Sequence, residues 1–226
     1  MSQDIRGGVV PHGPVIVGVM ELEPHATVLV AVDMHRGHLD PSVATLPLPA
    51  ERSRALIERS APIFAALRAS GIPVVHVVTI YRTPRESESN PFWGGKRSAT
   101  RARSHEHNLA GSPGTQIVPE LYAPTDIVVA TKKRYSAYLH TDLEFVLRDL
   151  GAKTVLLAGV NTNSCVLCTS FETVNRDFDL VVLRDCVDSM DGEEAHRMAL
   201  TLIETCLGRV LAWDEIREAL RLPAPA

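Results

Sequence analysis

Apolar runs recur along the chain without the polar alternation that is typical of a half-exposed strand. A strand that is apolar at nearly every position needs cover on both faces, as in a parallel sheet between two layers of helices. Helical spacing of apolar residues separates several of these runs, at 50–70, 167–178 and 193–206. The pattern predicts an α/β fold, a three-layer α/β/α sandwich with a mainly parallel, doubly wound sheet of roughly six strands. The expected strands span 27–32, 72–79, 126–130, 154–158, 180–183 and 209–212.

Length and composition favour a single domain. The chain has 226 residues, of which 45% are hydrophobic and 22% charged, enough apolar material for one core. We expect an N-terminal arm over residues 1–25 and one domain over residues 26–222. A long polar stretch at about 81–115 interrupts the strand and helix pattern. Such stretches in compact domains are usually binding loops or lids, or else disordered, and we expect a binding loop here.

The charge pattern argues against large anionic partners. The net charge is −4, and the sequence has no basic run beyond Lys132–Arg134 to attract a phosphate backbone. It has no apolar stretch of membrane-spanning length and no basic, then apolar leader at its start. We therefore expect a cytoplasmic protein that has no nucleic-acid partner and does not bind membranes.

The apolar run at 154–158 leads into a short polar turn that carries Cys165 to the start of a predicted helix. A thiol at a helix N-terminus is expected to have a lowered pKa, and backbone N–H groups of such a turn can stabilise an oxyanion. These properties would make Cys165 a nucleophile for acyl transfer. The alternative is a buried structural cysteine, which is the commoner role of a free thiol.

Two other strand ends carry charged residues, Asp33 and Lys132. Because the carboxyl ends of parallel strands meet at one edge of a sheet, Asp33, Lys132 and Cys165 should converge there. A carboxylate can take the proton of the thiol, and a lysine can orient the carboxylate and stabilise anions. Alternatively, Asp33 is a solvated cap and Lys132 a surface lysine.

These segments resemble the isochorismatase-like cysteine hydrolase superfamily over roughly Ala26–Trp213. The resemblance implies a catalytic triad of Asp33, Lys132 and Cys165. It also implies a cis peptide bond between Val160 and Asn161, and an oxyanion hole formed by the backbone N–H groups of Asn161 and Cys165. The matching segments are Leu29–Met34, Lys132–Tyr138 followed by Thr141–Leu143, and Gly159–Val166 followed by Thr169.

The resemblance also implies a reaction. A cysteine nucleophile favours the N-carbamoylsarcosine, ureidoacrylate and maleamate amidohydrolase branches, which hydrolyse a C–N bond of a small amide, carbamoyl or ureido compound. We expect this reaction through a thioester, without a cofactor, in a homodimer or homotetramer. One alternative is an ether hydrolase of the isochorismatase type, a branch that lacks the nucleophilic cysteine. Another is a redox-regulated or non-catalytic member that uses Cys165 and Cys168, which share one helix face.

Substrate specificity should come from loops over the strand ends. Arg36 could pair with a substrate carboxylate or be solvated, and His35 and His38 could contact substrate or be structural. The nicotinamidase branch binds a metal through an Asp and two His, but the expected Asp-x-His pair is not evident. We therefore predict no catalytic metal. The predicted substrate-binding residues are His35, Arg36, His38, Phe92, Trp93 and Tyr138.

Overall fold

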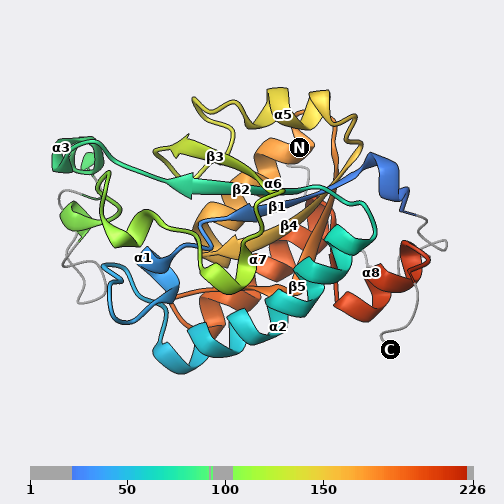
Figure 1. Cartoon of the computed structure of the whole chain (residues 1–226), viewed down its shortest axis with the longest axis horizontal. Helices are drawn as coiled ribbons and strands as arrows, with labels where there is room; N and C mark the ends of the chain where they lie inside the picture. The colour runs from blue at the N-terminus through green and yellow to red at the C-terminus, as the bar shows by residue number, and fades with distance from the viewer. Residues whose placement is uncertain (1–21, 92, 94–103, 223–226) are drawn as a thin grey trace, which may run out of the picture.

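The computed structural model describes residues 22–91, 93 and 104–222. Its centre is a parallel sheet of six strands in the order β3-β2-β1-β4-β5-β6 (Figure 1). The predicted α/β class, the strand count and the doubly wound order are confirmed. The strands are β1 (Thr27–Val32), β2 (Val74–Thr79), β3 (Ile127–Lys132), β4 (Thr154–Val160), β5 (Asp179–Asp188) and β6 (Arg209–Leu211).

Helices cover both faces of the sheet and give the three layers (Figure 1). Helices α2 (Ala50–Ala69) and α8 (Trp213–Ala219) pack on the face that carries Leu29 and Ala31 of β1. Helices α5 (Leu143–Asp149), α6 (Leu167–Val174) and α7 (Glu193–Cys206) lie on the other face, which carries Val28, Val30 and Val32. Because both faces are covered, all six positions of β1 are buried, which is why the strand shows no polar alternation.

Strands β1 and β4 approach closely where the sheet ends. Val32 pairs with Gly159, and a Cβ atom on Gly159 would lie 2.2 Å from the Val32 carbonyl oxygen. Gly159 also has a φ of 137°, a conformation that side chains rarely adopt. Glycine at this position therefore lets the segments after β1 and β4, which carry Asp33 and Cys165, leave the sheet side by side.

Helix α6 packs the apolar residues Leu167 and Val174 only partly against the core, and its fully buried residues are polar. Its buried residues are Thr169, Ser170 and Thr173, whereas Phe171 is 44% exposed. The hydroxyls of Ser170 and Thr173 donate to backbone carbonyls one turn earlier, at 2.9 and 2.8 Å, so a polar face can be buried without unpaired groups. The helix ends at Val174, so Phe178 packs in the core from beyond it.

The predicted binding loop contains short helices where the structure describes it. These are α3 (Pro84–Glu88), η3 (Ser104–Glu106) and η4 (Pro113–Thr115). An isolated bridge between Tyr81 and Leu109 pairs the start of this segment with a later part of it, and a second bridge pairs His35 with Ile117, just beyond the segment. The remaining short elements are η1 (Pro24–Ala26), α1 (Arg36–Leu39), η5 (Pro119–Leu121) and η6 (Thr162–Val166). No helix within the described ranges has both the length and the apolar character to cross a membrane.

Candidate active site

Three side chains from three strand ends meet in the protein interior. Lys132, the last residue of β3, places its Nζ 2.5 Å from Asp33 Oδ2 and 3.4 Å from Cys165 Sγ. Asp33 directly follows β1, and its backbone has a φ of 55°, a left-handed conformation that Asp tolerates better than most residues. The structure thus brings together the three residues whose convergence the strand pattern predicted.

Thr79, the last residue of β2, completes this arrangement. Its backbone N–H and its hydroxyl both donate to Asp33 Oδ1, at 2.9 and 2.8 Å. The same hydroxyl accepts a hydrogen bond from Lys132 Nζ at 2.8 Å. The sequence analysis missed Thr79, although its place as a polar residue at the end of a predicted strand is the signal that singled out Asp33 and Lys132.

Asp33 and Lys132 form a charged pair inside the protein, because each is only 1% exposed. Burial works to raise the pKa of Asp33, but the Lys132 ammonium, together with hydrogen bonding, holds that pKa well below its usual value. Burial likewise works to lower the pKa of Lys132, but the Asp33 carboxylate raises it above its usual value. Both groups therefore remain charged near neutral pH, and neither is a solvated surface residue.

Cys165 lies in η6, a π-helical turn that precedes α6. The predicted lowering of its pKa is wrong for the free protein: burial raises the pKa of the thiol to about 12, although the Lys132 charge acts in the opposite direction. The turn lies inside the molecule, and loss of solvent outweighs the helix N-terminus. The resting sulfur is therefore a neutral thiol that contacts an ammonium group.

Asp33, Lys132 and Cys165 line a pocket, and an aromatic pair forms part of the same lining. The indole N–H of Trp93 donates to the hydroxyl of Tyr135 at 2.8 Å, and the two rings meet edge to face. The Arg134 guanidinium lies over the Trp93 ring, 5.1 Å from its centroid. The pocket is lined by Asp33, His38, Leu46, Thr79, Tyr81, Ser87, Trp93, His107, Lys132, Arg134, Tyr135, Asn161, Ser164, Cys165 and Met190.

Two of the predicted substrate-binding residues, His38 and Trp93, line this pocket. His35 is fully buried and contacts the Asp33 carboxylate from within the protein, with its Nε2 3.5 Å from Asp33 Oδ1. Arg36 lies elsewhere: its guanidinium binds Asp40 one helical turn later at 2.8 Å and lines a separate surface cavity. This ion pair with Asp40, the residue that follows α1, holds the Arg36 side chain away from the strand ends. Phe92 lies outside the described residues.

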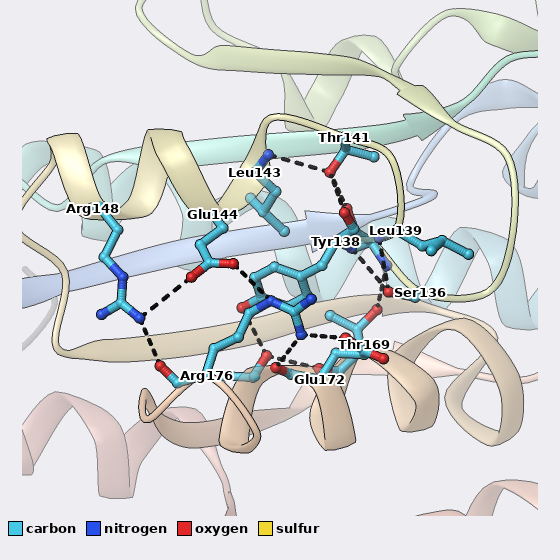
Figure 2. A network of polar contacts seen from close by, with 12 residues as sticks. Ser136, Tyr138, Leu139, Thr141, Leu143, Glu144, Arg148, Thr169, Glu172 and Arg176 are labelled. Atoms are coloured by element: carbon cyan, nitrogen blue, oxygen red, sulfur yellow. Dashed lines mark hydrogen bonds and ion pairs between the residues drawn. The ribbon is translucent and has the colours of Figure 1, made fainter.

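Tyr138 is not brought to the pocket either, because it belongs to a polar network beside α6 (Figure 2). Its hydroxyl hydrogen-bonds to Thr173 at 3.0 Å, and the Arg176 guanidinium lies over its ring at 4.6 Å. Glu144 of α5 accepts a hydrogen bond from Arg176 at 2.9 Å in the same network. This network anchors the segment that follows Lys132 to α5 and α6, so Tyr138 holds the site in place from outside the pocket.

The segment around Asn161 forms another wall of the pocket. The peptide bond between Val160 and Asn161 is cis, at the position that the resemblance implied. The Asn161 carbonyl accepts backbone hydrogen bonds from Ser164 and Val166, and its side-chain Oδ1 accepts one from the Met190 N–H at 2.8 Å. Asn161 and Cys165, the predicted oxyanion donors, thus border the same cavity.

Three buried histidines gather beside Asp33: His35, His38 and His107, here called the histidine cluster. One ring nitrogen of each lies within 4.8 Å of one from each of the others. Burial, with the neighbouring His35, lowers the pKa of His38 to about 3, and burial also holds the pKa of His107 well below its usual value. Both of these rings are therefore neutral. The sequence analysis missed His107, because nothing in the pattern of the long loop predicts that it folds back to His35 and His38.

The four cysteines are free in the structure. Cys165 lies in the pocket, whereas Cys168 is partly exposed on α6, and burial and the nearby Glu172 raise the pKa of its thiol. Cys168 is not among the residues that line the pocket, so the pocket offers Cys165 no second thiol for a redox pair.

Known proteins share both the sequence pattern and the fold. The sequence profile of the isochorismatase domain matches residues 27–215. The chain is 30% identical to ureidoacrylate amidohydrolase RutB of Methylobacterium radiotolerans, over an alignment that covers 100% of this chain and 90% of that protein. It is 26% identical to maleamate amidohydrolase of Pseudomonas putida, with 85% of this chain and 86% of the relative covered.

A solved structure shows the same architecture. The crystal structure of a cysteine hydrolase from Pseudomonas syringae pv. phaseolicola superposes with a TM-score of 0.73, covering 88% of this chain and 94% of the other. The two sequences are 21% identical, so this likeness concerns the fold.

Proposed function

Because the chain belongs to the isochorismatase family of hydrolases, we propose that it hydrolyses a C–N bond of a small amide, carbamoyl or ureido compound through a cysteine thioester. One observation carries the proposal. The Lys132 ammonium contacts both the Asp33 carboxylate and the Cys165 sulfur in a pocket of mixed polar and aromatic lining. The amidohydrolases that the chain resembles support a C–N bond as the target.

In the first step, the Cys165 sulfur attacks the substrate carbonyl carbon while Asp33 receives the thiol proton. The raised pKa of Cys165 makes a resting thiolate rare at neutral pH. Deprotonation therefore has to accompany formation of the carbon–sulfur bond, as general-base catalysis allows. Lys132 remains charged and keeps the Asp33 carboxylate oriented toward the pocket.

The tetrahedral intermediate places negative charge on the former carbonyl oxygen. The backbone N–H groups of Asn161 and Cys165 are the proposed donors to this oxygen, since both residues border the pocket. Asp33 then gives its proton to the departing nitrogen, which leaves as ammonia or an amine. In the second half, Asp33 takes a proton from water, and the resulting nucleophile cleaves the thioester and restores the thiol.

The test measures ammonia or amine release from a panel that includes ureidoacrylate, maleamate and N-carbamoyl amino acids. Cys165→Ser is the blank, and Cys168→Ser is the matched control because it removes a neighbouring thiol outside the pocket. We expect turnover by the wild type and by Cys168→Ser, with none by Cys165→Ser. Intact-mass spectrometry of rapidly quenched wild type should detect an acyl adduct on Cys165. Equal loss of activity in both cysteine variants, or no release from any compound, contradicts the proposal.

A further inference from the structure

The geometry of the histidine cluster points to a second site beside the proposed nucleophile. We propose that His35, His38 and His107 bind a divalent metal ion that prefers imidazole ligands, such as zinc. The three rings come from the segment after β1 and from the loop that follows β2, and all three are buried. Imidazole donors suit zinc, cobalt, nickel and copper, whereas magnesium and calcium prefer oxygen ligands.

His38 and His107 each have one ring nitrogen hydrogen-bonded within the part of the chain that the structure describes, and the same described residues give the other nitrogen no hydrogen bond. His38 Nδ1 lies 2.6 Å from the Leu46 carbonyl, which can only accept, so this nitrogen carries the proton and Nε2 carries a lone pair. His107 Nδ1 lies 2.9 Å from the Thr45 hydroxyl, which can accept in the same way. Histidines that bind metals usually have this kind of support on the ring nitrogen opposite the ion.

His35 supplies the third nitrogen. Its Nδ1 is buried and has no hydrogen-bond partner among the described residues, while its Nε2 lies 3.5 Å from Asp33 Oδ1 and 2.8 Å from Asn108 Nδ2. Nδ1 can bind a metal when the ring proton is on Nε2, directed toward the Asp33 carboxylate. The Asn108 amide then turns so that its Oδ1, which is also buried without a partner, accepts from His35. This turn gives up the 2.8 Å bond from Asn108 to the Thr79 carbonyl.

The cluster leaves room for a fourth ligand. Zinc lies about 2.0–2.1 Å from imidazole nitrogens, which places tetrahedral nitrogens roughly 3.4 Å apart. The ring nitrogens of the three histidines lie within 4.8 Å of one another, so they have to move closer together when the ion binds. His38 and His107 line the pocket that holds Cys165, so the fourth position opens toward substrate. A bound ion there would hold a water molecule or a heteroatom of the substrate.

The test needs no substrate, so it is independent of the proposed reaction. Purified full-length protein is stripped with a chelator, and zinc binding is measured by calorimetry and by metal content after dialysis. Cobalt serves as a spectroscopic probe of the coordination geometry. The variants are His38→Gln and His107→Gln, with His105→Gln as the matched control because His105 is partly exposed, two residues from His107 and outside the cluster.

We expect one zinc per chain in the wild type and in His105→Gln, with tetrahedral cobalt bands in the visible spectrum. His38→Gln and His107→Gln should each weaken zinc binding by at least about 10-fold. Zinc should also raise the Tm of the wild type but not of either cluster variant, which separates lost binding from misfolding. Cys165→Ser should retain the ion. Less than stoichiometric zinc in the wild type, unchanged affinity in His107→Gln, or loss of zinc in Cys165→Ser overturns the proposal.

Discussion

Replacing Lys132 by methionine tests whether the fold depends on a buried charge pair. The substitution keeps a side chain of similar length but leaves the Asp33 carboxylate, which is 1% exposed, without its cation. Removing one member of a buried pair costs about 3–5 kcal/mol. Asp33 keeps two hydrogen bonds from Thr79, so we place the loss at the lower end, about 3 kcal/mol. For a domain of this size the Tm should fall by about 6–12 °C.

The reciprocal variant, Asp33→Asn, leaves the Lys132 ammonium buried and should cost a similar amount. The double variant carries no charge at the site, so it should be more stable than either single variant, with a coupling free energy of at least about 2 kcal/mol. The assay is urea unfolding followed by far-UV circular dichroism near neutral pH, with Cys165→Ser as a control that leaves the pair intact. A cost below about 1 kcal/mol for Lys132→Met, or single-variant costs that simply add, would refute the reasoning.

The effect should also depend on pH, and its sign follows from the carboxylate. In the wild type the depressed pKa of Asp33 contributes stability above the usual carboxyl pKa, and this contribution is lost as the pH falls through the depressed value. In Lys132→Met, burial without the cation raises the pKa of Asp33, so the folded state gains a proton more readily than the unfolded chain. The difference in stability between wild type and variant should therefore shrink on acidification.

Three further outcomes follow from the site. Because the pKa of Cys165 is about 12, its alkylation by iodoacetamide, followed by peptide mass spectrometry, should accelerate about 10-fold per pH unit from neutral to mildly alkaline pH, and a plateau there would contradict this. Thr79→Val should lower the free energy of unfolding by about 1–3 kcal/mol in urea titrations, because Asp33 and Lys132 each lose a partner. Arg36→Gln should leave kcat/KM unchanged on any compound the enzyme turns over, because Arg36 lies outside the pocket.

The sheet and the meeting of three strand ends could be predicted because both depend on local sequence. Continuous apolar runs mark strands that are buried on both faces, and a parallel sheet places the residues after those strands at one edge. Asp33, Lys132 and Cys165 needed no further information to be placed together. The same local signal applies to Thr79, which ends β2, so its place beside Asp33 and Lys132 could also have been predicted.

The electrostatic state of Cys165 could not be predicted in the same way. A helix N-terminus is visible in the sequence, but the loss of solvent around the sulfur depends on the loop after β2 and on the segment after β5, which close the pocket. Loss of solvent raises the pKa of a thiol, whereas the helix terminus lowers it, and only the folded structure shows which effect is larger. The contrast between His35 and Arg36 also depends on the folded structure, because His35 is the buried N-cap of α1, whereas Arg36 begins the helix and pairs with Asp40.

The loop after β2 joins Asp33 and Lys132 to the histidine cluster through the side chain of Asn108. A Cβ atom on Gly37 would lie 2.0 Å from Asn108 Oδ1, so the α1 turn can approach the loop only with glycine at this position. Asn108 in turn donates to the carbonyl of Thr79, whose hydroxyl binds Asp33 and Lys132. The position of His107, the residue before Asn108, is therefore fixed by contacts connected to those that orient the Asp33 carboxylate. A rearrangement at Asn108 that allowed metal binding would alter the hydrogen bonds around Thr79, so an ion in the cluster would be linked to the Asp33 carboxylate through Asn108.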